Sequence, residues 1–408
     1  MHSNSNTQKS NTYYLKNNPF LIAAKDGDLA IVRSLLEKDK NHLETTDILG
    51  QTALIIAAIC GHAEVVEFLI GEGANLDAKT FAEIDESEEK YKPNSYQFWG
   101  RTALYYAIEN HHSNIACLLI ERGASVTLTK TDLQPIHLAI VKRDFPVLKK
   151  LVEACPHSIH INYGMNAFTG PLERNGKIAP LHCAALLNNK HDSDLNDQIE
   201  IINCLLAKGA DVNAQIVQKN PDNKFLNLHG FTPLHCAVTE ENAVAALVLI
   251  KAGSNLHLKA GPYEQLPIHY AAEKESMRGM VLKMLELDPH LVDETDKLGR
   301  TPLDIAAANN CKKIAAVIIM HEYEILGRPV RHFHEENGKL VFNEVVQEDQ
   351  PKISNPPHQK TEKEIMEVTE NNTTRKHTVF FTLGIDLHTP VSEIADSTLG
   401  LRQRKKSH

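Results

Sequence analysis

The chain has 408 residues, of which 42% are hydrophobic, only 6% are aromatic and 23% are charged. A chain of this length forms two or three ordinary domains or one long array of repeats, and its core has to be mainly aliphatic. The net charge of −9 argues against DNA or RNA as the main partner, because nucleic-acid binding depends on contacts of Lys and Arg with phosphates. No apolar run approaches the roughly 18 residues of a membrane span, so we expect no transmembrane segment.

The N-terminal residues 1–12 are polar, contain no apolar stretch of the secretory-signal type and are expected to be disordered. A first pair of helices is expected directly after them. Asn18-Pro19-Phe20 is followed by Ala23-Ala24 and then by an apolar stretch that includes Leu35-Leu36. We interpret this layout as a degenerate first copy of a phrase that recurs through the chain.

A Thr-Pro-Leu-His-like tetrad is repeated along the chain, and an alanine follows each copy. The clear copies are Thr52-Ala53-Leu54, Thr102-Ala103-Leu104, Gln134-Pro135-Ile136-His137, Ala179-Pro180-Leu181-His182, Thr232-Pro233-Leu234-His235, Leu266-Pro267-Ile268-His269 and Thr301-Pro302-Leu303-Asp304. Some gaps between copies are close to a period of about 33 residues, and the others are longer. With the degenerate copy there are eight units, and the longer gaps predict insertions at about 80–99, 161–176, 188–197 and 215–229.

Each unit is expected to form two helices. Proline in the first turn costs no hydrogen bond, since the N–H group that it lacks has no partner there, and the threonine before it can cap the helix. A second helix follows with apolar residues at helical spacing, as in Val65-Val66-Phe68-Leu69-Ile70, and ends at a glycine such as Gly73. Because no single unit can bury its own apolar face, neighbouring units have to stack.

These features resemble the ankyrin-repeat family. The best matches are Gly230-Phe231-Thr232-Pro233-Leu234-His235-Cys236-Ala237 and Leu205-Leu206-Ala207-Lys208-Gly209-Ala210-Asp211-Val212-Asn213-Ala214. The resemblance implies an all-α solenoid of helix pairs with short β-hairpin loops, spanning residues 13–329, whose concave face binds other proteins. Three units depart from the pattern and are expected to be less regular, because Ile55, Tyr105 and Asp304 replace the histidine.

The insertion at 80–99 is rich in acidic and aromatic residues and includes the only tryptophan of the chain. In the family's layout, residues around the Gly-x-Thr of a unit lie at a hairpin tip that faces a partner. The resemblance therefore nominates Tyr96, Phe98, Trp99 and Arg101 as contact residues, since buried aromatic and arginine side chains dominate interface energies. The alternative is that Phe98 and Trp99 pack against the insertion itself.

The resemblance also nominates the C-terminal ends of the first helices as an inner, partner-facing strip. These inner-face residues are Ile59, Glu109, Asn110, Lys142, Thr239, Glu240, Glu273 and Lys274. They include charges of both signs, so they indicate no particular class of ligand.

Cysteine and histidine usage favours structural roles. The seven cysteines are Cys60, Cys117, Cys155, Cys183, Cys204, Cys236 and Cys311. Their odd number and wide spacing indicate free, mostly buried thiols in a reducing compartment. The tetrad histidines are expected to bind the local backbone and threonine hydroxyl groups, because no zinc-type spacing is present. We therefore expect no metal or other cofactor and, since nucleotide-binding and hydrolase motifs are missing from the sequence, no enzyme activity.

Residues 330–408 follow the last unit and are mostly polar, so we expect a largely disordered, irregular tail. Two apolar islands interrupt it, Leu340-Val341-Phe342 and the strand-like Thr378-Val379-Phe380-Phe381-Thr382-Leu383. Either island folds back over the last helix, or it is a short motif that another protein reads. The basic residues 402–406 are consistent with a solvated terminus, a nuclear address, a membrane contact or an export signal.

The sequence thus predicts a monomeric adaptor or scaffold that binds another protein in the cytoplasm. Two alternatives stay open. One is a secreted bacterial effector that binds a host protein in the host cytoplasm and is exported through its C-terminal residues. The other is an enzyme whose site lies in the insertions or the tail, since a catalytic Cys and His meet only in the folded chain.

Overall fold

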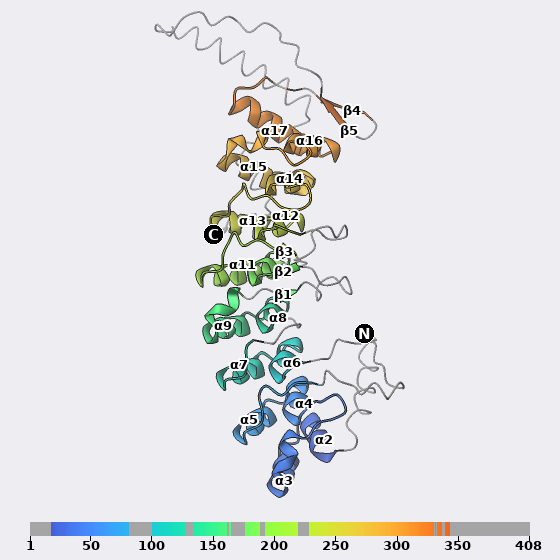
Figure 1. Ribbon diagram of the computed structural model, residues 1–408, viewed down its shortest axis with the longest axis vertical. Coiled ribbons are helices and arrows are strands. Elements are labelled where there is room, and N and C mark those ends of the chain that lie inside the picture. Colours follow the sequence, from blue (N-terminus) through green and yellow to red (C-terminus); the bar gives the residue numbers. More distant parts are fainter. Residues whose placement is uncertain are drawn as a thin grey trace, which may run out of the picture. The chain divides into compact units, whose positions relative to one another are not determined.

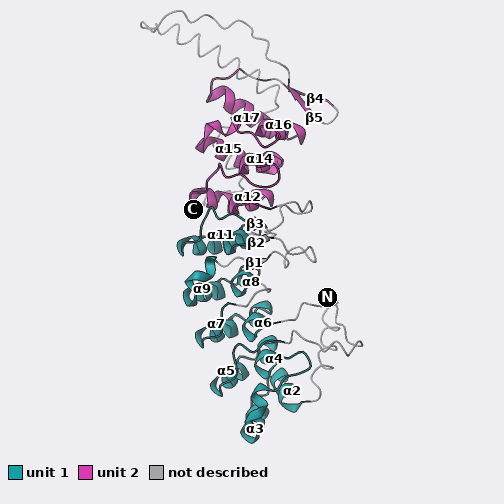
Figure 2. Ribbon diagram, in the orientation of Figure 1, with its two compact units in different colours: residues 1–220 teal, residues 221–408 magenta. Residues whose placement is uncertain are grey.

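The computed structural model describes residues 18–80, 100–127, 134–160, 163–164, 176–187, 192–218, 228–329, 331, 333–336 and 339–342. The chain divides into two compact units, residues 1–220 and 221–408 (Figure 2), and the expected single array across both units stays a prediction. The N-terminal segment 1–12, the insertion residues 81–99 and most of the tail lie outside the described residues. The disorder expected for the two ends therefore stays a prediction.

Unit 1 contains five helix pairs among its described residues, arranged in two layers (Figure 1). Each first helix packs against the next first helix, and each second helix against the next second helix. The first helices are α2 (Pro19–Asp26), α4 (Ala53–Cys60), α6 (Ala103–Glu109), α8 (Pro135–Val141) and α10 (Pro180–Ala185). The second helices are α3 (Leu29–Lys38), α5 (Ala63–Gly71), α7 (Ser113–Glu121), α9 (Phe145–Ala154) and α11 (Asp192–Ala207), and 3-10 turns follow α3 at Lys40–Glu44 and α9 at Pro156–His160.

Unit 2 repeats this architecture with three further pairs among its described residues (Figure 1). The helices are α12 (Pro233–Thr239), α13 (Ala243–Lys251), α14 (Pro267–Ala272), α15 (Arg278–Leu287), α16 (Pro302–Ala308) and α17 (Lys312–Glu324), with 3-10 turns at Glu275–Met277 and Pro289–Asp293. The eight pairs confirm the expected architecture of stacked helix pairs.

The first helices begin where the tetrads predict. The Thr52 hydroxyl accepts a hydrogen bond from the backbone N–H of Ile55 at 3.4 Å, and Thr102 accepts one from Tyr105 at 3.3 Å. Such a cap satisfies a backbone donor that the helix leaves unpaired, and its loss typically costs about 1 kcal/mol. The tetrad is thus first of all a helix-initiation signal.

The turn after α4 links neighbouring repeats. Gly61 has a φ of +81°, a left-handed conformation that favours glycine. A β-carbon there would lie 2.6 Å from the His112 ring, whose Nε2 donates to the carbonyl oxygen of Ile59 at 3.1 Å. The glycine therefore makes room for a histidine that fastens the third repeat to the second.

The core lies between the two layers. In α4, every residue from Ala53 to Ala58 is buried, whereas α5 buries Val65, Val66 and Leu69 and exposes its glutamates. Fully burying one such aliphatic side chain contributes about 1.5–3 kcal/mol. The first helices need cover on several sides to gain this energy, so the pairs are stable only when stacked.

Two of the expected insertions share a small antiparallel sheet, which corrects the expectation of plain loops. Strand β2 (Gly176–Ile178) lies between β1 (Tyr163–Gly164) and β3 (Val217–Gln218), with Tyr163 opposite Ile178 and Gly176 opposite Gln218. The buried Ile178 and Ile216 anchor the sheet. The two insertions, although distant in sequence, are therefore joined at their described ends by this one sheet.

The insertion expected at 188–197 is also corrected. Helix α11 begins at Asp192, so residues 192–197 form its first turns. The fully buried Gln198 explains the extension, because its side-chain amide donates to the carbonyl oxygen of Ala184 at 2.7 Å and fastens α11 to the end of α10. Polar residues that suggested a loop lie in a helix instead.

The first apolar island of the tail folds back. Strand β4 (Phe333–Glu336) pairs antiparallel with β5 (Lys339–Phe342), and β5 contacts α16. Leu340 is buried in this contact region, and Lys312 of α17 forms an ion pair with Glu335. Of the two alternatives for this island, the structure shows folding back, with β5 against α16 and Glu335 of β4 paired with Lys312 of the last helix.

Candidate functional site

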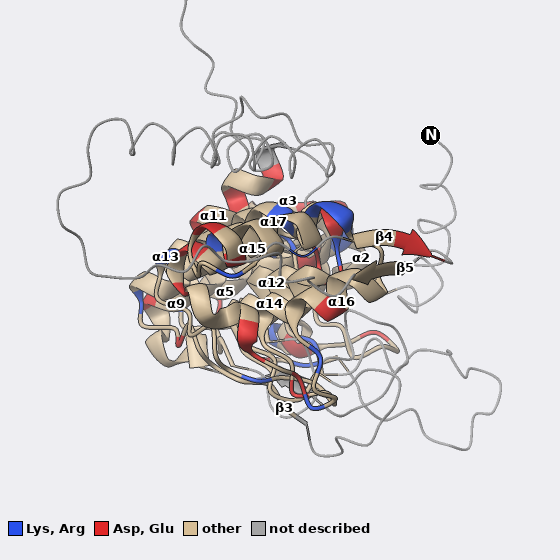
Figure 3. Cartoon of the chain, turned by 90° about the horizontal axis from the view of Figure 1, so that it is seen from above, with Lys and Arg blue, Asp and Glu red and all other residues tan. Residues whose placement is uncertain are grey.

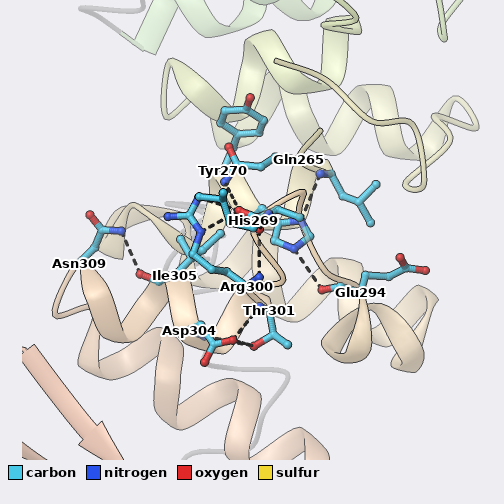
Figure 4. Close-up of polar contacts among 12 residues, drawn as sticks. Gln265, His269, Tyr270, Glu294, Arg300, Thr301, Asp304, Ile305 and Asn309 are labelled. Carbon is cyan, nitrogen blue, oxygen red and sulfur yellow. Dashed lines mark hydrogen bonds and ion pairs between the residues drawn. The ribbon is translucent and has the colours of Figure 1, made fainter. Parts of the chain in front are cut away.

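The tetrad histidines join each helix start to the next repeat. In unit 2, Nδ1 of His235 accepts hydrogen bonds from the backbone N–H and the hydroxyl of Thr232, at 3.2 and 2.8 Å, and Nε2 lies 3.3 Å from the carbonyl oxygen of Gln265. His269 makes the same link to the carbonyl oxygen of Glu294 at 3.1 Å (Figure 4). Since a carbonyl only accepts, Nε2 carries the proton. The expected structural role of these histidines is confirmed.

The tetrad tolerates variation without losing this geometry. His137 is fully buried, and its Nε2 lies 3.2 Å from the carbonyl oxygen of Ile178. Burial lowers the pKa of His137 to about 4, so it is neutral at pH 7. In the last repeat the Asp304 carboxylate accepts hydrogen bonds from the N–H and hydroxyl of Thr301, each at 2.8 Å (Figure 4). The repeat expected to be irregular at Asp304 thus keeps its cap.

The inner-face residues of unit 1 are held by contacts within and between repeats. Nζ of Lys142 lies 3.2 Å from Oε1 of Glu109, an ion pair between adjacent repeats. The side-chain amide of Asn110 donates to the carbonyl oxygen of Tyr106 at 2.9 Å, and Ile59 is half-buried. The structure places all four nominated residues at the ends of successive first helices, and their contact with a partner stays a prediction.

The inner-face residues of unit 2 follow the same plan. Thr239 and Glu240 are exposed, and the Thr239 hydroxyl donates to the backbone carbonyl four residues earlier at 2.8 Å. Nζ of Lys274 lies 3.5 Å from Oε1 of Glu241. Burial raises the pKa of the half-buried Glu273 carboxyl. A partner would meet a surface whose side chains are already partly ordered.

The insertion nominated for its aromatic residues is described only at its base. Tyr96, Phe98 and Trp99 lie outside the described residues. Arg101 is half-buried, and its guanidinium lies 4.4 Å from the ring centroid of Tyr105 on its own repeat. The N–H of Arg101 donates to the Thr80 hydroxyl at 3.1 Å, so the insertion leaves and rejoins the repeat at one point.

Sequence reasoning missed an exposed strip at two loop tips of unit 2. This tip strip consists of Pro262, Tyr263, Glu264, Lys297 and Leu298. Tyr263 is 46% exposed and Leu298 is 60% exposed. The backbone N–H of Lys297 donates to the carbonyl oxygen of Tyr263 at 2.8 Å, and Nζ of Lys297 lies 3.3 Å from Oε1 of Glu264. The two loops are therefore fixed to each other, with large apolar side chains facing solvent.

A signal for the tip strip was present in the sequence. Leu298 precedes Gly299-Arg300-Thr301 just as Trp99 precedes Gly100-Arg101-Thr102. The layout that nominates Trp99 as a tip residue nominates Leu298 equally. Arg300 supports the strip from beneath, since its guanidinium lies 5.4 Å from the ring centroid of Tyr263.

The turns around Asp47 and Asp296 are built alike in the two units. Oδ1 of Asp296 accepts the N–H groups of Leu298 and Arg300 at 2.8 and 3.0 Å, and Oδ1 of Asp47 accepts those two and four residues ahead at 2.9 and 2.8 Å. Oδ2 of Asp296 receives two hydrogen bonds from the Arg300 guanidinium, at 2.8 and 2.6 Å. Oδ2 of Asp47 is buried without a hydrogen-bond partner in the structure, because Gln51 stands where unit 2 has arginine.

Neither a charged patch nor a metal cluster distinguishes the described surface. Acidic and basic residues are intermixed over the helices (Figure 3). No group of three or more His, Cys, Asp and Glu side chains within the described ranges is placed to hold a metal ion. All seven cysteines are free, and Cys60 is exposed rather than buried as expected. Among the helices that the structure describes, none is long and apolar enough to span a bilayer.

Comparison with protein families is decisive for the repeats. A family model described as ankyrin repeats, in three copies, matches residues 1–80, 20–130 and 80–165. A model of the single ankyrin repeat matches residues 178–216 and 229–260. Helices α14 to α17 continue the same architecture beyond the matched residues.

Individual relatives share only the repeat region. The E3 ubiquitin-protein ligase KEG of Arabidopsis thaliana is 25% identical over 272 residues, which is 61% of this chain and 15% of the relative. The putative ankyrin repeat protein FPV031 of fowlpox virus is 26% identical over 225 residues, 52% of this chain and 58% of the relative. The chain thus spans less than two thirds of either relative. The human ASB11 ankyrin repeat domain superposes with a TM-score of 0.43 at 18% identity, covering 75% of this chain and 98% of that domain.

Proposed function

The chain belongs to the ankyrin-repeat family, and from this premise we propose that it is a non-catalytic adaptor that binds another protein. The contact surface in this proposal is the tip strip of unit 2, extended by the inner-face residues of the same unit. The family is typically a protein-interaction module, and the exposed residues of the tip strip support this choice of contact surface.

The observation that carries the proposal is the pair of exposed apolar side chains on adjacent, mutually bonded loop tips. Tyr263 and Leu298 remain 46% and 60% exposed although their loops are fixed by a backbone hydrogen bond and by the Glu264–Lys297 ion pair. An ordered surface of this kind loses little conformational entropy on binding. Tyrosine is also among the residues that most often contribute large interface energies.

The inner-face contacts of unit 2 support the same reading. The Lys274–Glu241 pair is exposed and is worth at most about 1 kcal/mol to folding. It contributes little to stability but orders two long side chains on a surface of mixed charge. Mixed charges at the rim of an interface mainly select the partner and its orientation.

The experiment that tests this function places a photoreactive amino acid at Leu298 of the full chain. Leu287 provides a matched control, since it is the same residue type, is 53% exposed and lies at the end of α15 on the other layer. Irradiation in a cell extract should join a defined protein to the chain from position 298 but not from position 287.

Three outcomes contradict the proposal in different ways. Equal crosslinking from both positions would show non-specific contact. Crosslinking from position 287 alone would place the contact on the wrong layer. If the intact chain chemically modifies the captured partner, the chain is an enzyme and not an adaptor.

A further inference from the structure

The turn at Asp47 in unit 1 holds a buried carboxylate oxygen that the described chain leaves unpaired. Asp47 is 4% exposed, and its Oδ1 accepts the backbone N–H groups of Leu49 and Gln51. Oδ2 is buried as well and has no hydrogen-bond partner in the structure. A buried carboxylate oxygen without a donor has lost its hydration and gained nothing in return, which makes such atoms uncommon in native proteins. We therefore expect a donor from outside the described chain at Oδ2.

Unit 2 shows which donor fits this turn. Asp296 is held in the same way by two backbone N–H groups, and its side chain is completely buried. Nε and Nη2 of Arg300 both donate to Oδ2 of Asp296, at 2.8 and 2.6 Å. The Arg300 side chain itself stays 37% exposed, so its guanidinium approaches the buried carboxylate from the solvent side. A carboxylate buried in this turn is therefore within reach of a guanidinium that arrives from solvent.

The described part of unit 1 supplies no such group. Gln51 takes the place of Arg300 and is half-buried. Burial raises the pKa of the Tyr106 hydroxyl, and the Gln51 side chain is one of the groups that oppose this effect, so Gln51 lies near Tyr106. The guanidinium of Arg101 lies 6.0 Å from the ring centroid of Tyr106. Among the described residues, no basic side chain forms an ion pair with Asp47.

The side chains next to Asp47 suit the aliphatic part of an arginine. Ile48 is 37% exposed, and Leu49 beside it is half-buried. An arginine packs its methylene groups on apolar surface of this kind while its guanidinium makes hydrogen bonds. Lysine fits less well, because its ammonium group lacks the planar fork that directs two N–H groups to one carboxylate.

We infer that the Asp47 turn is a binding site for the guanidinium of an arginine side chain that another protein presents to unit 1. The guanidinium donates to Oδ2 of Asp47 as Arg300 donates to Asp296, and the Gln51 side chain, which makes no bond to Oδ2, turns aside. The site goes beyond the proposed function, since the tip strip lies on unit 2 and needs no arginine. It adds affinity only for partners that carry an arginine at the matching place, so it contributes specificity.

A small guanidinium compound tests the site directly. Ethylguanidinium chloride is titrated into the full chain, and the carboxyl carbons of Asp47 and Asp296 are followed by NMR, with Asp47→Asn used to identify the Asp47 signal. This signal should shift to saturation with a dissociation constant on the order of 10 mM, as expected for so small a ligand. Asp296 is the matched control in the same molecule, because Arg300 already binds its Oδ2. Its signal should stay in place.

Two variants and a second cation test the position and the geometry of binding. Gln51→Arg supplies the guanidinium from the chain itself and should abolish the response of Asp47. Gln51→Met is the control variant, because methionine matches glutamine in length, has no donor and should leave the response intact. Ethylammonium chloride should bind the wild type at least about tenfold more weakly than ethylguanidinium, since it cannot make the two N–H contacts that Arg300 makes.

Three results would overturn the assignment. An Asp47 signal that does not respond, or that shifts linearly together with Asp296, would show at most a general effect of salt. Equal affinity for ethylammonium would show that the turn does not select a guanidinium. An undiminished response in Gln51→Arg would show that the cation binds elsewhere. All three leave the adaptor proposal untouched, because that proposal is tested at Leu298 of unit 2.

Discussion

The loops at Asp47 and Asp296 form the same hydrogen-bonded turn, but the protein shifts the pKa of the two carboxyl groups in opposite directions. Both aspartates are almost fully buried, and both hold two backbone N–H groups through Oδ1. Burial raises the pKa of Asp47, and the two N–H groups only partly oppose it. Burial acts on Asp296 as well, but hydrogen bonds from Arg300 and from the backbone outweigh it and lower the pKa.

The opposite pKa shifts indicate that the Asp296 loop is the more strongly stabilised of the two at neutral pH. The Asp296 charge is compensated by Arg300, whose guanidinium also contacts the Tyr263 ring of the tip strip, so the loop and the tip strip are stabilised together. The Asp47 loop makes the turn without compensating the charge. One buried carboxylate therefore strengthens its loop at neutral pH, and the other weakens it.

The largest expected effect on stability comes from His137, a fully buried imidazole on which no carboxylate of the described residues acts to compensate a proton. Its pKa of about 4 lies below the usual 6.5, so the unfolded chain binds the proton first as the pH falls. Stability should fall from about pH 6.5 downwards, by about 3 kcal/mol between pH 7 and pH 4 from this residue. Urea unfolding of the wild type and of His137→Gln, which does not titrate, should differ by this amount in pH dependence. Parallel pH profiles would refute the buried, neutral imidazole.

The next effect breaks the compensated loop. Asp296→Asn removes the charge that Arg300 neutralises, while Oδ1 can still accept the two N–H groups. Removing one member of a buried pair costs 3–5 kcal/mol, and because the Arg300 side chain is 37% exposed we expect about 2 kcal/mol at pH 7. Chemical denaturation measures the loss. It should shrink as the pH falls below the usual range of aspartate, since the lowered pKa makes the native advantage of Asp296 a property of the charged form.

The uncompensated loop should respond in the opposite direction. Asp47→Asn removes a charge that the folded state disfavours, so stability at pH 7 should stay equal or rise by up to about 1 kcal/mol. The raised pKa of Asp47 means that this gain vanishes when the carboxyl is protonated at low pH. Equal losses from Asp47→Asn and Asp296→Asn would show that the two loops do not differ as described.

The smallest expected effect on stability comes from a substitution that gives the Asp47 loop the arginine of the Asp296 loop. Gln51→Arg places a guanidinium at the position that Arg300 has in unit 2, and a partly exposed pair of this kind contributes about 0.5 kcal/mol. The clearer readout is the titration of Asp47, observed by NMR of its carboxyl group. Its pKa should move downwards in Gln51→Arg, whereas Gln51→Lys should move it less because lysine cannot form two parallel hydrogen bonds. An unchanged titration would mean that the arginine does not reach Oδ2.

Sequence reasoning recovered the parts of the fold that rest on local signals. Thr232, Pro233 and His235 act within one helical turn, so their spacing alone predicts the cap that the structure has. The eight helix pairs follow from the recurrence of that signal. Asp304 shows that the signal depends on a hydrogen-bond acceptor at this position and not on histidine itself, since a carboxylate performs the role of the imidazole.

Features that rest on distant contacts were not predictable. Gly176 pairs with Gln218 although the residues between them form a helix pair, and no local pattern fixes that register. The polar residues after Asp192 look like a loop until Gln198 is seen to bind the end of α10. The tip strip is an intermediate case, because Leu298 could be placed by the repeat layout but its exposure and its neighbour Tyr263 could not.

The most direct test of the central account is the dissociation constant of the crosslinked partner for three full-length chains: wild type, Leu298→Asp and Leu287→Asp. A charge in the middle of an apolar contact should weaken binding by at least about 2 kcal/mol, or roughly thirtyfold, for Leu298→Asp. Leu287→Asp should bind like the wild type. Wild-type affinity for Leu298→Asp, or an equal loss in both variants, would contradict the assignment of the tip strip as the surface that holds the partner.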